Sequence, residues 1–386
     1  MTKAHQTLLP KNYLFVFLLI SSTLVIAQSD STKSKFRFNG DFRFRVEQDW
    51  DSRKSDGSYR EDRSRLRYRL RAGLDYHLNP KILVGTRIRT GDPKKQQDPQ
   101  LTLGDGFNEF GTLPIALEKA FFQLNLGTFE MWLGKNTFSF KKQNELFWSD
   151  NVYPEGLHIQ KTFNPKLNWV DHLNINAGHF ILNTRGGSFV EDSYFQGIQL
   201  VSQHFDNRFA VWPSLYLFRN IQDIPDGAET FFLDYSIASV GGYVKLSRSP
   251  LVQLEMDWYL NLEDYSTNDS IPEDLQNQKS GVTLAANYGQ LTKKGDWLVK
   301  LTYTYLERFS ALDFMAQNDW ARWDYSSFGS PDGRLTNLEG IEFTLGTKIE
   351  DKIALKMKYY WVDQLVPLGT FKENGQRIRF DIDIKI

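Results

Sequence analysis

The sequence predicts an all-β protein: a transmembrane antiparallel up-and-down β-barrel of about 16 strands, with short periplasmic turns and long extracellular loops. Apolar and polar residues alternate over many segments of roughly 8 to 13 residues, and a period of two is that of a β-strand. The connections between these segments alternate between short and long. Aromatic residues make up 15% of the chain and charged residues 24%, which suits a barrel with one face in lipid and the other in water.

The first 27 residues have the features of a secretory signal peptide. Lys3 and Lys11 precede an apolar core from Tyr13 to Ile26, and Val25-x-Ala27 fits a cleavage site. The core is shorter than the ~20 residues that a spanning helix needs. The chain contains no cysteine, so no disulfide framework is expected. We therefore expect a signal peptide at residues 1–27 and a single barrel domain at residues 28–386.

The stretch from Arg63 to Tyr76 is the most informative predicted strand. Every second residue from Arg63 to Arg71 is arginine, and Leu66 and Leu70 lie among the residues between them. A soluble sheet would turn the apolar face inward, whereas a membrane barrel turns it towards lipid and the charged face towards a water-filled lumen. Alternation alone leaves a soluble β-sandwich, jelly roll or propeller open. The regular succession of short and long connections favours the membrane barrel.

The same pattern continues to the end of the chain. Aromatic residues near strand ends, Trp212, Trp258, Trp297 and Trp361 among them, are expected to form girdles at the membrane interfaces. Long loops are predicted at residues 48–62, 91–114, 136–155, 183–193, 219–229, 263–279 and 308–336. The predicted strands cover residues 35–47, 63–76, 82–89, 119–126, 129–135, 157–163, 173–182, 196–205, 209–218, a segment ending at 246, 252–262, 281–288, 297–307, 340–347, 353–363 and 377–386.

Several motifs resemble one family of membrane barrels. Residues 63–90, followed by Gly91-Asp92, precede Leu103-Gly104, Ala120-Phe121-Phe122, Leu133-Gly134-Lys135 and Tyr153-Pro154-Glu155-Gly156. In this order they resemble the putative porins of Gram-negative outer membranes, a group related to phosphate-selective and alginate-export barrels. The resemblance is specific over roughly residues 36 to 160 and implies a channel in contact with outer-membrane lipid and lipopolysaccharide. Such barrels usually finish on an aromatic residue, whereas this chain finishes on Ile386, with Phe380 further in on the same face.

The orientation of the strands predicts which side chains line the lumen. A row of cations on the lipid face would cost about 2–4 kcal/mol for each residue at the midplane, so the arginines should point inward. Glu255, Asp257 and Glu263 are expected to form an acidic wall opposite. The predicted basic wall comprises Arg43, Arg45, Arg65, Arg67, Arg69, Arg71, Arg87, Arg89, Lys119, Arg377 and Arg379.

One long loop is expected to narrow the pore. In trimeric general porins, which the chain resembles in its strand count, the third long loop folds inward, and the resemblance allows a homotrimer here. The competing candidate is the second long loop, with Asp105 and Glu109. The candidate constriction residues of the third loop are Lys141, Lys142, Glu145, Asp150 and Glu155.

These features favour a water-filled channel for passive diffusion of small hydrophilic solutes, anion-preferring through its arginines. The alternative is a channel selective for phosphate or anionic oligosaccharides, since guanidinium offers bidentate contacts to such groups. The arginines could instead brace the wall against Asp41, Glu47 and Asp75. A loop-based adhesin or receptor, using residues 308–336 with Trp320 and Trp323, stays open as a third class.

Other functions are not supported by the sequence. The net charge of −1 argues against nucleic acid as a partner. No histidine lies in a recognisable nucleophile or zinc motif, so we expect neither enzymatic activity nor a metal or other cofactor. The six histidines are His5, His77, His158, His172, His179 and His204.

Overall fold

The computed structural model describes residues 34–386 apart from 105–110, 166, 224–230 and 321–335. The predicted signal peptide, and the loop residues Asp105, Glu109 and Trp323, lie outside the described residues. Residues from Phe36 to Ile386 form one compact unit.

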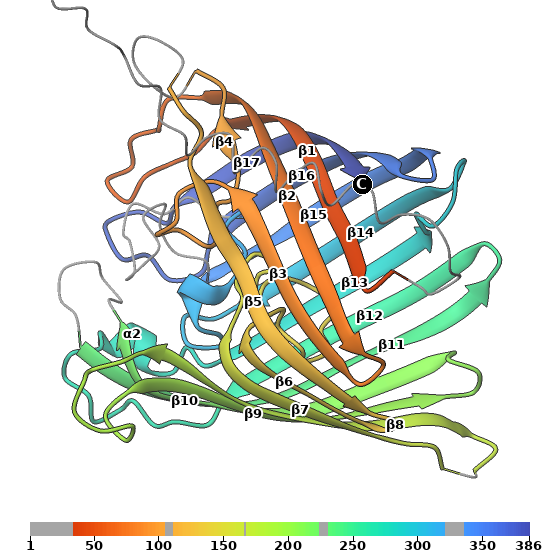
Figure 1. Cartoon of the computed structure of the whole chain (residues 1–386). Helices are drawn as coiled ribbons and strands as arrows, with labels where there is room; N and C mark the ends of the chain where they lie inside the picture. Colours follow the sequence, from red (N-terminus) through yellow and green to blue (C-terminus); the bar gives the residue numbers. More distant parts are fainter. Residues whose placement is uncertain (1–33, 105–110, 166, 224–230, 321–335) are drawn as a thin grey trace, which may run out of the picture. The chain divides into compact units, whose positions relative to one another are not determined.

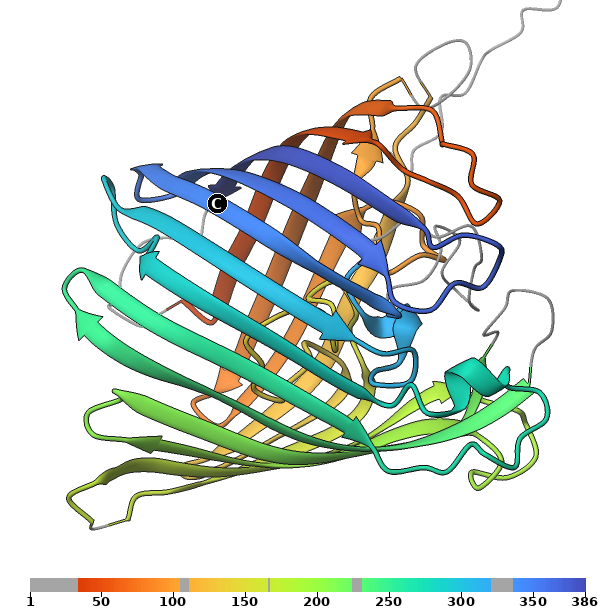
Figure 2. The same cartoon turned by 180° about the vertical axis from the view of Figure 1, so that it is seen from behind.

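This unit is a closed antiparallel barrel of 16 strands, which confirms the predicted fold (Figure 1, Figure 2). Each barrel strand pairs with its neighbour in the chain, and β17 pairs back with β1. The strands are β1 (Phe36–Trp50), β2 (Arg63–Asn79), β3 (Ile82–Thr90), β5 (Ile115–Leu126), β6 (Phe129–Lys135), β7 (Glu155–Phe163), β8 (Val170–Asn183), β9 (Ser193–His204), β10 (Phe209–Asp223), β11 (Phe231–Arg248), β12 (Leu251–Asn261), β13 (Ser280–Gly289), β14 (Trp297–Leu306), β15 (Leu338–Glu350), β16 (Ile353–Gln364) and β17 (Asn374–Lys385).

The remaining elements are short and belong to the long connections. The two-residue strand β4 (Leu101–Thr102) extends the ladder of β2 beyond the end of β3. The helix α2 (Glu273–Gln276) and the 3₁₀ turn η1 (Asp313–Met315) lie between β12 and β13 and between β14 and β15. No helix in the described part of the chain is long and apolar enough to cross a membrane.

Long loops lie at one rim of the barrel and short turns at the other. Figure 1 shows the long loops on the left and the turns on the right. Strand β1 begins and β17 ends at the turn rim, since the first and last connections between strands are both long. The predicted alternation of short and long connections therefore corresponds to the two rims of the barrel.

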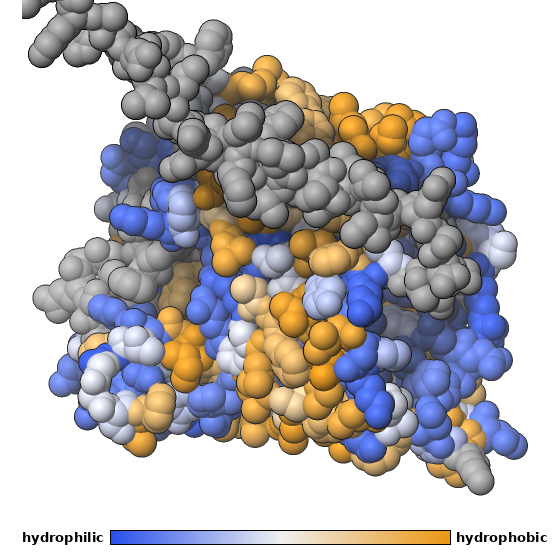
Figure 3. Space-filling model, in the orientation of Figure 1, coloured by the Kyte–Doolittle hydropathy of each residue, from blue (hydrophilic) through white to orange (hydrophobic). Residues whose placement is uncertain are grey.

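The two faces of β2 have opposite character. Arg67 and Arg69 are both 6% exposed and point into the barrel, whereas Leu66 and Leu70 are 46% and 44% exposed on its outside. Figure 3 shows the apolar outer surface on the strands that face the viewer, with hydrophilic residues towards the rims. An apolar outer surface around charged interior side chains is the arrangement of a membrane barrel.

The interior is only partly hydrophilic, because aromatic side chains fill one side of it. Phe138 and Trp148, from the connection between β6 and β7, stack with ring centroids 4.5 Å apart and pack against Phe195 of β9. The predicted outer girdle is wrong for Trp212, which is 1% exposed and lies inside the barrel, near Tyr243. Trp258, Trp297 and Trp361 are 37%, 58% and 51% exposed.

Candidate functional site in the barrel lumen

The arginine wall is built by strands β17, β1 and β2, which lie side by side. We use this name for the inward-facing arginines of these strands. The register places Arg45 opposite Asp381 on one neighbouring strand and opposite Arg67 on the other. Glu47, two residues further along β1, lies opposite Arg65 and Arg379. The carboxylates of β1 and β17 therefore lie opposite cations of the neighbouring strands, whereas β2 contributes arginines alone from Arg63 to Arg71.

Ion pairs hold these side chains in place. Arg43 contacts Asp383 at 2.5 Å, Arg45 contacts Asp381 at 2.6 Å, and Arg377 contacts Asp49 at 2.5 Å. Arg65 pairs with Glu47, Arg69 with Asp41, and Arg67 with Asp98 at 2.5 Å. Asp41 and Glu47, which the sequence predicts as bracing partners, therefore contact the wall. The third predicted partner, Asp75, instead accepts a hydrogen bond from Asn39.

Glu118 on β5 is a central partner that the alternation missed. It contacts Arg71 at 3.0 Å, Arg87 at 2.6 Å and Arg89 at 3.7 Å. The pairing of β3 with β5 shifts between Arg87 and Ile88, so Glu118 is an extra residue in the strand. Such a bulge lets two consecutive side chains leave the same face. Glu118 is buried beside Lys119, whose ammonium lies 5.1 Å from the ring centre of Tyr153.

The three carboxylates predicted on the opposite side have separate environments. Glu255 accepts hydrogen bonds from Lys300 at 2.7 Å and from Asn287. Asp257 accepts from the backbone N–H of Gln143 at 2.9 Å and from the Asn144 amide at 2.7 Å. Glu263 follows the end of β12 and pairs with Arg219 at 3.0 Å. Asp257 therefore anchors a loop, and Glu263 lies at the loop rim.

The loop between β6 and β7, residues 136–154, folds into the barrel, and we call it the constriction loop. Its aromatic residues pack against the apolar side of the interior, while its charged residues face the remaining space. Lys141, Lys142, Glu145 and Asp150 line the same cavity. Glu155 is not part of the loop, because it opens β7, is exposed, and pairs with Lys135.

Two further long connections meet the constriction loop inside the barrel. The backbone N–H of Gln317, between β14 and β15, donates to the carbonyl of Glu145 at 2.9 Å. The backbone N–H of Tyr153 bonds the side chain of Gln96, between β3 and β5, at 2.8 Å. The side-chain amide of Gln97 donates to the carbonyl of Phe314 at 2.5 Å. Three loops thus narrow the lumen together.

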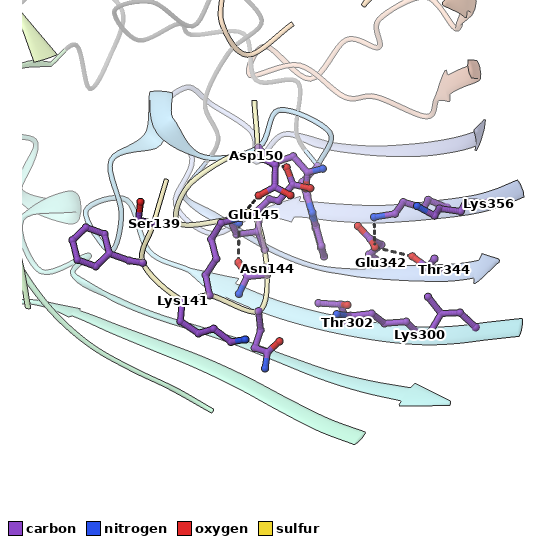
Figure 4. A pocket seen from close by; sticks show the side chains of 18 residues that line it. Ser139, Lys141, Asn144, Glu145, Asp150, Lys300, Thr302, Glu342, Thr344 and Lys356 are labelled. Atoms are coloured by element: carbon purple, nitrogen blue, oxygen red, sulfur yellow. Dashed lines mark hydrogen bonds and ion pairs between the residues drawn. The ribbon is translucent and has the colours of Figure 1, made fainter. Parts of the chain in front are cut away.

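A cavity of about 570 Å³ lies between the constriction loop and strands β14, β15 and β16 (Figure 4). Polar groups such as Thr302 and Thr344 line it together with Trp320. Lys142 pairs with Asp150 at 2.5 Å, whereas Lys141 has no carboxylate partner among the described residues. The charged residues that line this cavity are Lys141, Lys142, Lys300, Lys356 and Lys358, with Glu145, Asp150 and Glu342.

A smaller cavity of about 140 Å³ lies on the arginine wall. The Nε groups of Arg67, Arg69 and Arg71 are buried there without a hydrogen-bond partner. The cavity is lined by six arginines (Arg43, Arg45, Arg67, Arg69, Arg71 and Arg379) and four carboxylates (Asp98, Glu145, Asp150 and Asp319).

Three of the described histidines contact neighbouring side chains within the barrel wall. His158 is 1% exposed and packs between the rings of Trp132 and Phe140. His179 and His204 interact with Gln196 and Ser202. Among the described residues, no group of three histidine, aspartate or glutamate side chains could hold a metal ion.

The fold is similar to solved structures of bacterial porins. A Rhodopseudomonas blastica porin triple mutant is 12% identical, with 90% of this chain and 100% of that chain covered and a TM-score of 0.50. Salmonella typhi OmpF, in complex with daunomycin, is 12% identical over 91% and 97%, with a TM-score of 0.52. Pseudomonas putida OprB is 12% identical over 91% and 94%, with a TM-score of 0.53. At such identities the similarity concerns the fold alone.

A search of the curated proteins finds no significant match. Residues 57–233 match the family model described as "Putative porin". This match covers strands β2 and β3, the constriction loop and strands β5 to β10. Over these residues the chain is similar to the putative porin family, and its closed 16-strand barrel has the fold of bacterial porins.

Proposed function

We propose that the protein conducts small hydrophilic solutes by passive diffusion and that its pore has a modest preference for anions. The observation that carries this proposal is Lys141 at the cavity of about 570 Å³ beside the constriction loop: the other four lysines of the lining pair with carboxylates, whereas Lys141 has no carboxylate partner among the described residues. A channel lined by an excess of one charge attracts the opposite ion.

The arginine wall, which holds eight of the eleven predicted cations, contributes less to selectivity than this number suggests. Eight carboxylates contact it: Asp41, Glu47, Asp49, Asp98, Glu118, Asp319, Asp381 and Asp383. A cation beside a carboxylate exerts little field at a distance, since the two potentials largely cancel. The wall therefore supports the barrel first and repels cations second.

Lys141 is the sharpest test of this proposal, because its charge has no described carboxylate partner. A unit charge roughly 7 Å from an ion in water contributes below about 1 kcal/mol, so Lys141→Ala should lower the anion-to-cation permeability ratio roughly two- to threefold. The measurement is the reversal potential in a KCl gradient across a planar bilayer. Lys294→Ala is the matched control, since Lys294 is exposed in a turn and pairs with Glu350 at 2.7 Å. Cation preference in the unmodified protein would contradict the proposal.

A channel selective for phosphate or other oxyanions is the second candidate. The partnerless Nε groups of Arg67, Arg69 and Arg71 on the smaller cavity favour it, because a buried guanidinium N–H needs an acceptor. Phosphate should then block chloride current at concentrations where sulfonate buffers do not. A homotrimer and cleavage after Ala27 stay predictions, which chemical cross-linking and N-terminal sequencing of the exported protein would test.

A further inference from the structure

The carboxylate of Asp319 lies among three arginines of the wall. Its Oδ1 is 3.4 Å from Nη1 of Arg45, and its Oδ2 accepts a short hydrogen bond from Arg379. The guanidinium of Arg377 donates to the backbone carbonyl of Asp319 at 2.7 Å. Asp319 is 9% exposed, and the three arginines are 2–6% exposed. A loop carboxylate therefore occupies a buried guanidinium site.

The three arginines do not depend on Asp319 for their positions. Arg45 is bound by Asp381 through two hydrogen bonds of 2.6 and 3.1 Å, and Arg377 is bound by Asp49. The Nε of Arg379 also lies 3.5 Å from Oδ2 of Asp381, in an ion pair that is not a hydrogen bond. Without Asp319 the site would keep three arginines and three carboxylates, because Glu47 also lies 3.8 Å from Arg45. The guanidinium groups that Asp319 now contacts would then be free to bind another carboxylate.

The residues on either side of Asp319 contact the constriction loop, the loop before β5 and the barrel wall. The carbonyl of Met315 accepts from the backbone N–H of Ser149 at 2.7 Å, and Gln317 bonds Glu145 as described above. Trp320 packs edge-on against Tyr360. Gln317 and Trp320 line the larger cavity, while Gln317 and Asp319 line the smaller one. This stretch therefore lies between the two cavities.

We propose that Arg45, Arg377 and Arg379 form a binding site for small solutes that carry a carboxylate, and that Asp319 is a built-in occupant which such a solute displaces. Exchanging one carboxylate for another leaves the charge of the buried site unchanged. The solute regains the bidentate contacts that guanidinium offers, and the displaced stretch opens a path between the cavities. Asp319 is tethered to the chain and therefore competes at an effective concentration in the mM range. A solute must be present at roughly that concentration to displace it. The inference rests on the proposed channel function.

The absence of cysteine from the chain allows a direct test. Ala316 is 0% exposed, so Ala316→Cys should react slowly with a maleimide in the folded, detergent-solubilised barrel. Sodium malonate at ~10 mM or above should raise the labelling rate, whereas sodium chloride at equal ionic strength should not. Ala210→Cys is the matched control, because Ala210 is 0% exposed on β10 and away from this stretch.

Asp319→Asn, added to Ala316→Cys, should raise the labelling rate in chloride at least about tenfold, since a buried charge pair broken on one side is strongly destabilised. It should also remove the malonate effect. Equal labelling in malonate and chloride would overturn the proposal. If Asp319→Asn does not fold, as judged by heat-modifiable migration in electrophoresis, the comparison of malonate with chloride on Ala316→Cys tests the proposal by itself. The labelling needs no ionic current, so a barrel that responds to malonate without conducting would refute the channel and leave the site.

Discussion

Glu118 lies 3.0 Å from Arg71 because a β-bulge in β5 turns Glu118 and Lys119 into the barrel together. The same carboxylate contacts Arg87 and Arg89. Three cations from β2 and β3 therefore share one buried anion. The stability of this part of the barrel depends on that single carboxylate.

Replacement of Glu118 by Gln should destabilise the barrel. Removing one partner of a buried ion pair costs about 3–5 kcal/mol, and here three guanidiniums would be left facing each other. The measurement is the temperature at which the folded band is lost in heat-modifiable electrophoresis. Glu350→Gln, which breaks an exposed pair with Lys294, should change that temperature little. Equal effects of the two substitutions would contradict the role given to Glu118.

Asp257 should hold the constriction loop in place. Replacing Asp257 by Ala removes the acceptor for Gln143 and Asn144, so the loop should fluctuate and the single-channel conductance should rise and become noisier. Asp264→Ala is a suitable control, because Asp264 is exposed in the loop after β12. An unchanged conductance in Asp257→Ala would show that the aromatic contacts hold the loop alone.

Those aromatic contacts give a separate prediction. Trp148 is 0% exposed, stacks on Phe138 and donates to the carbonyl of Val152 at 2.8 Å. Trp148→Ala should cost about 3–5 kcal/mol and release the loop more completely than Asp257→Ala. Limited proteolysis of the folded barrel would detect the release as new cleavage within residues 136–154. Continued protection of this loop would be the contrary result.

The contact of Asp319 with the wall should survive mild acid. Burial alone would raise the pKa of Asp319, but Arg379, Arg45 and Arg377 hold that pKa well below its usual value. A carboxyl group with a lowered folded-state pKa stabilises the fold above its unfolded pKa of about 3.9, and this stabilisation is lost only as the pH falls through the lower, folded pKa.

Ala316→Cys should therefore stay protected from neutral pH down to about pH 4, as measured with a pyridyl disulfide, which reacts in acid. Asp319→Asn should show no protection at any pH in this range. Exposure of the cysteine at mildly acidic pH in the Asp319 protein would contradict the ion-pair account.

Much of the architecture follows from the sequence, because a barrel strand in a membrane has only two environments. The opposite exposure of Arg67 and Leu66 follows from their alternation once lipid is assigned to one face. Glu118 was missed, since strict alternation places it outside and a bulge leaves no mark in the pattern. Trp212 was misplaced because aromatic residues suit both a lipid interface and an apolar interior.

The role of Asp319 could not be predicted from the sequence at all. Its contact with Arg45 spans 274 residues, and it comes from a loop without any strand pairing. The resemblance to trimeric general porins predicts that the third long loop folds inward. In the structure, Lys141, Lys142, Glu145 and Asp150 of that loop line one cavity. The sequence predicts Asp257 only as a pore-lining charge, whereas in the structure it accepts hydrogen bonds from Gln143 and Asn144 of the loop.

We propose that the barrel conducts ions through the cavity beside the constriction loop. The most direct test is the conductance of the purified full-length protein in a planar bilayer, compared with that of Lys141→Ala. We predict discrete channel openings with a modest anion preference that falls in the variant. The absence of any conductance, or a cation preference in the unmodified protein, would contradict this account.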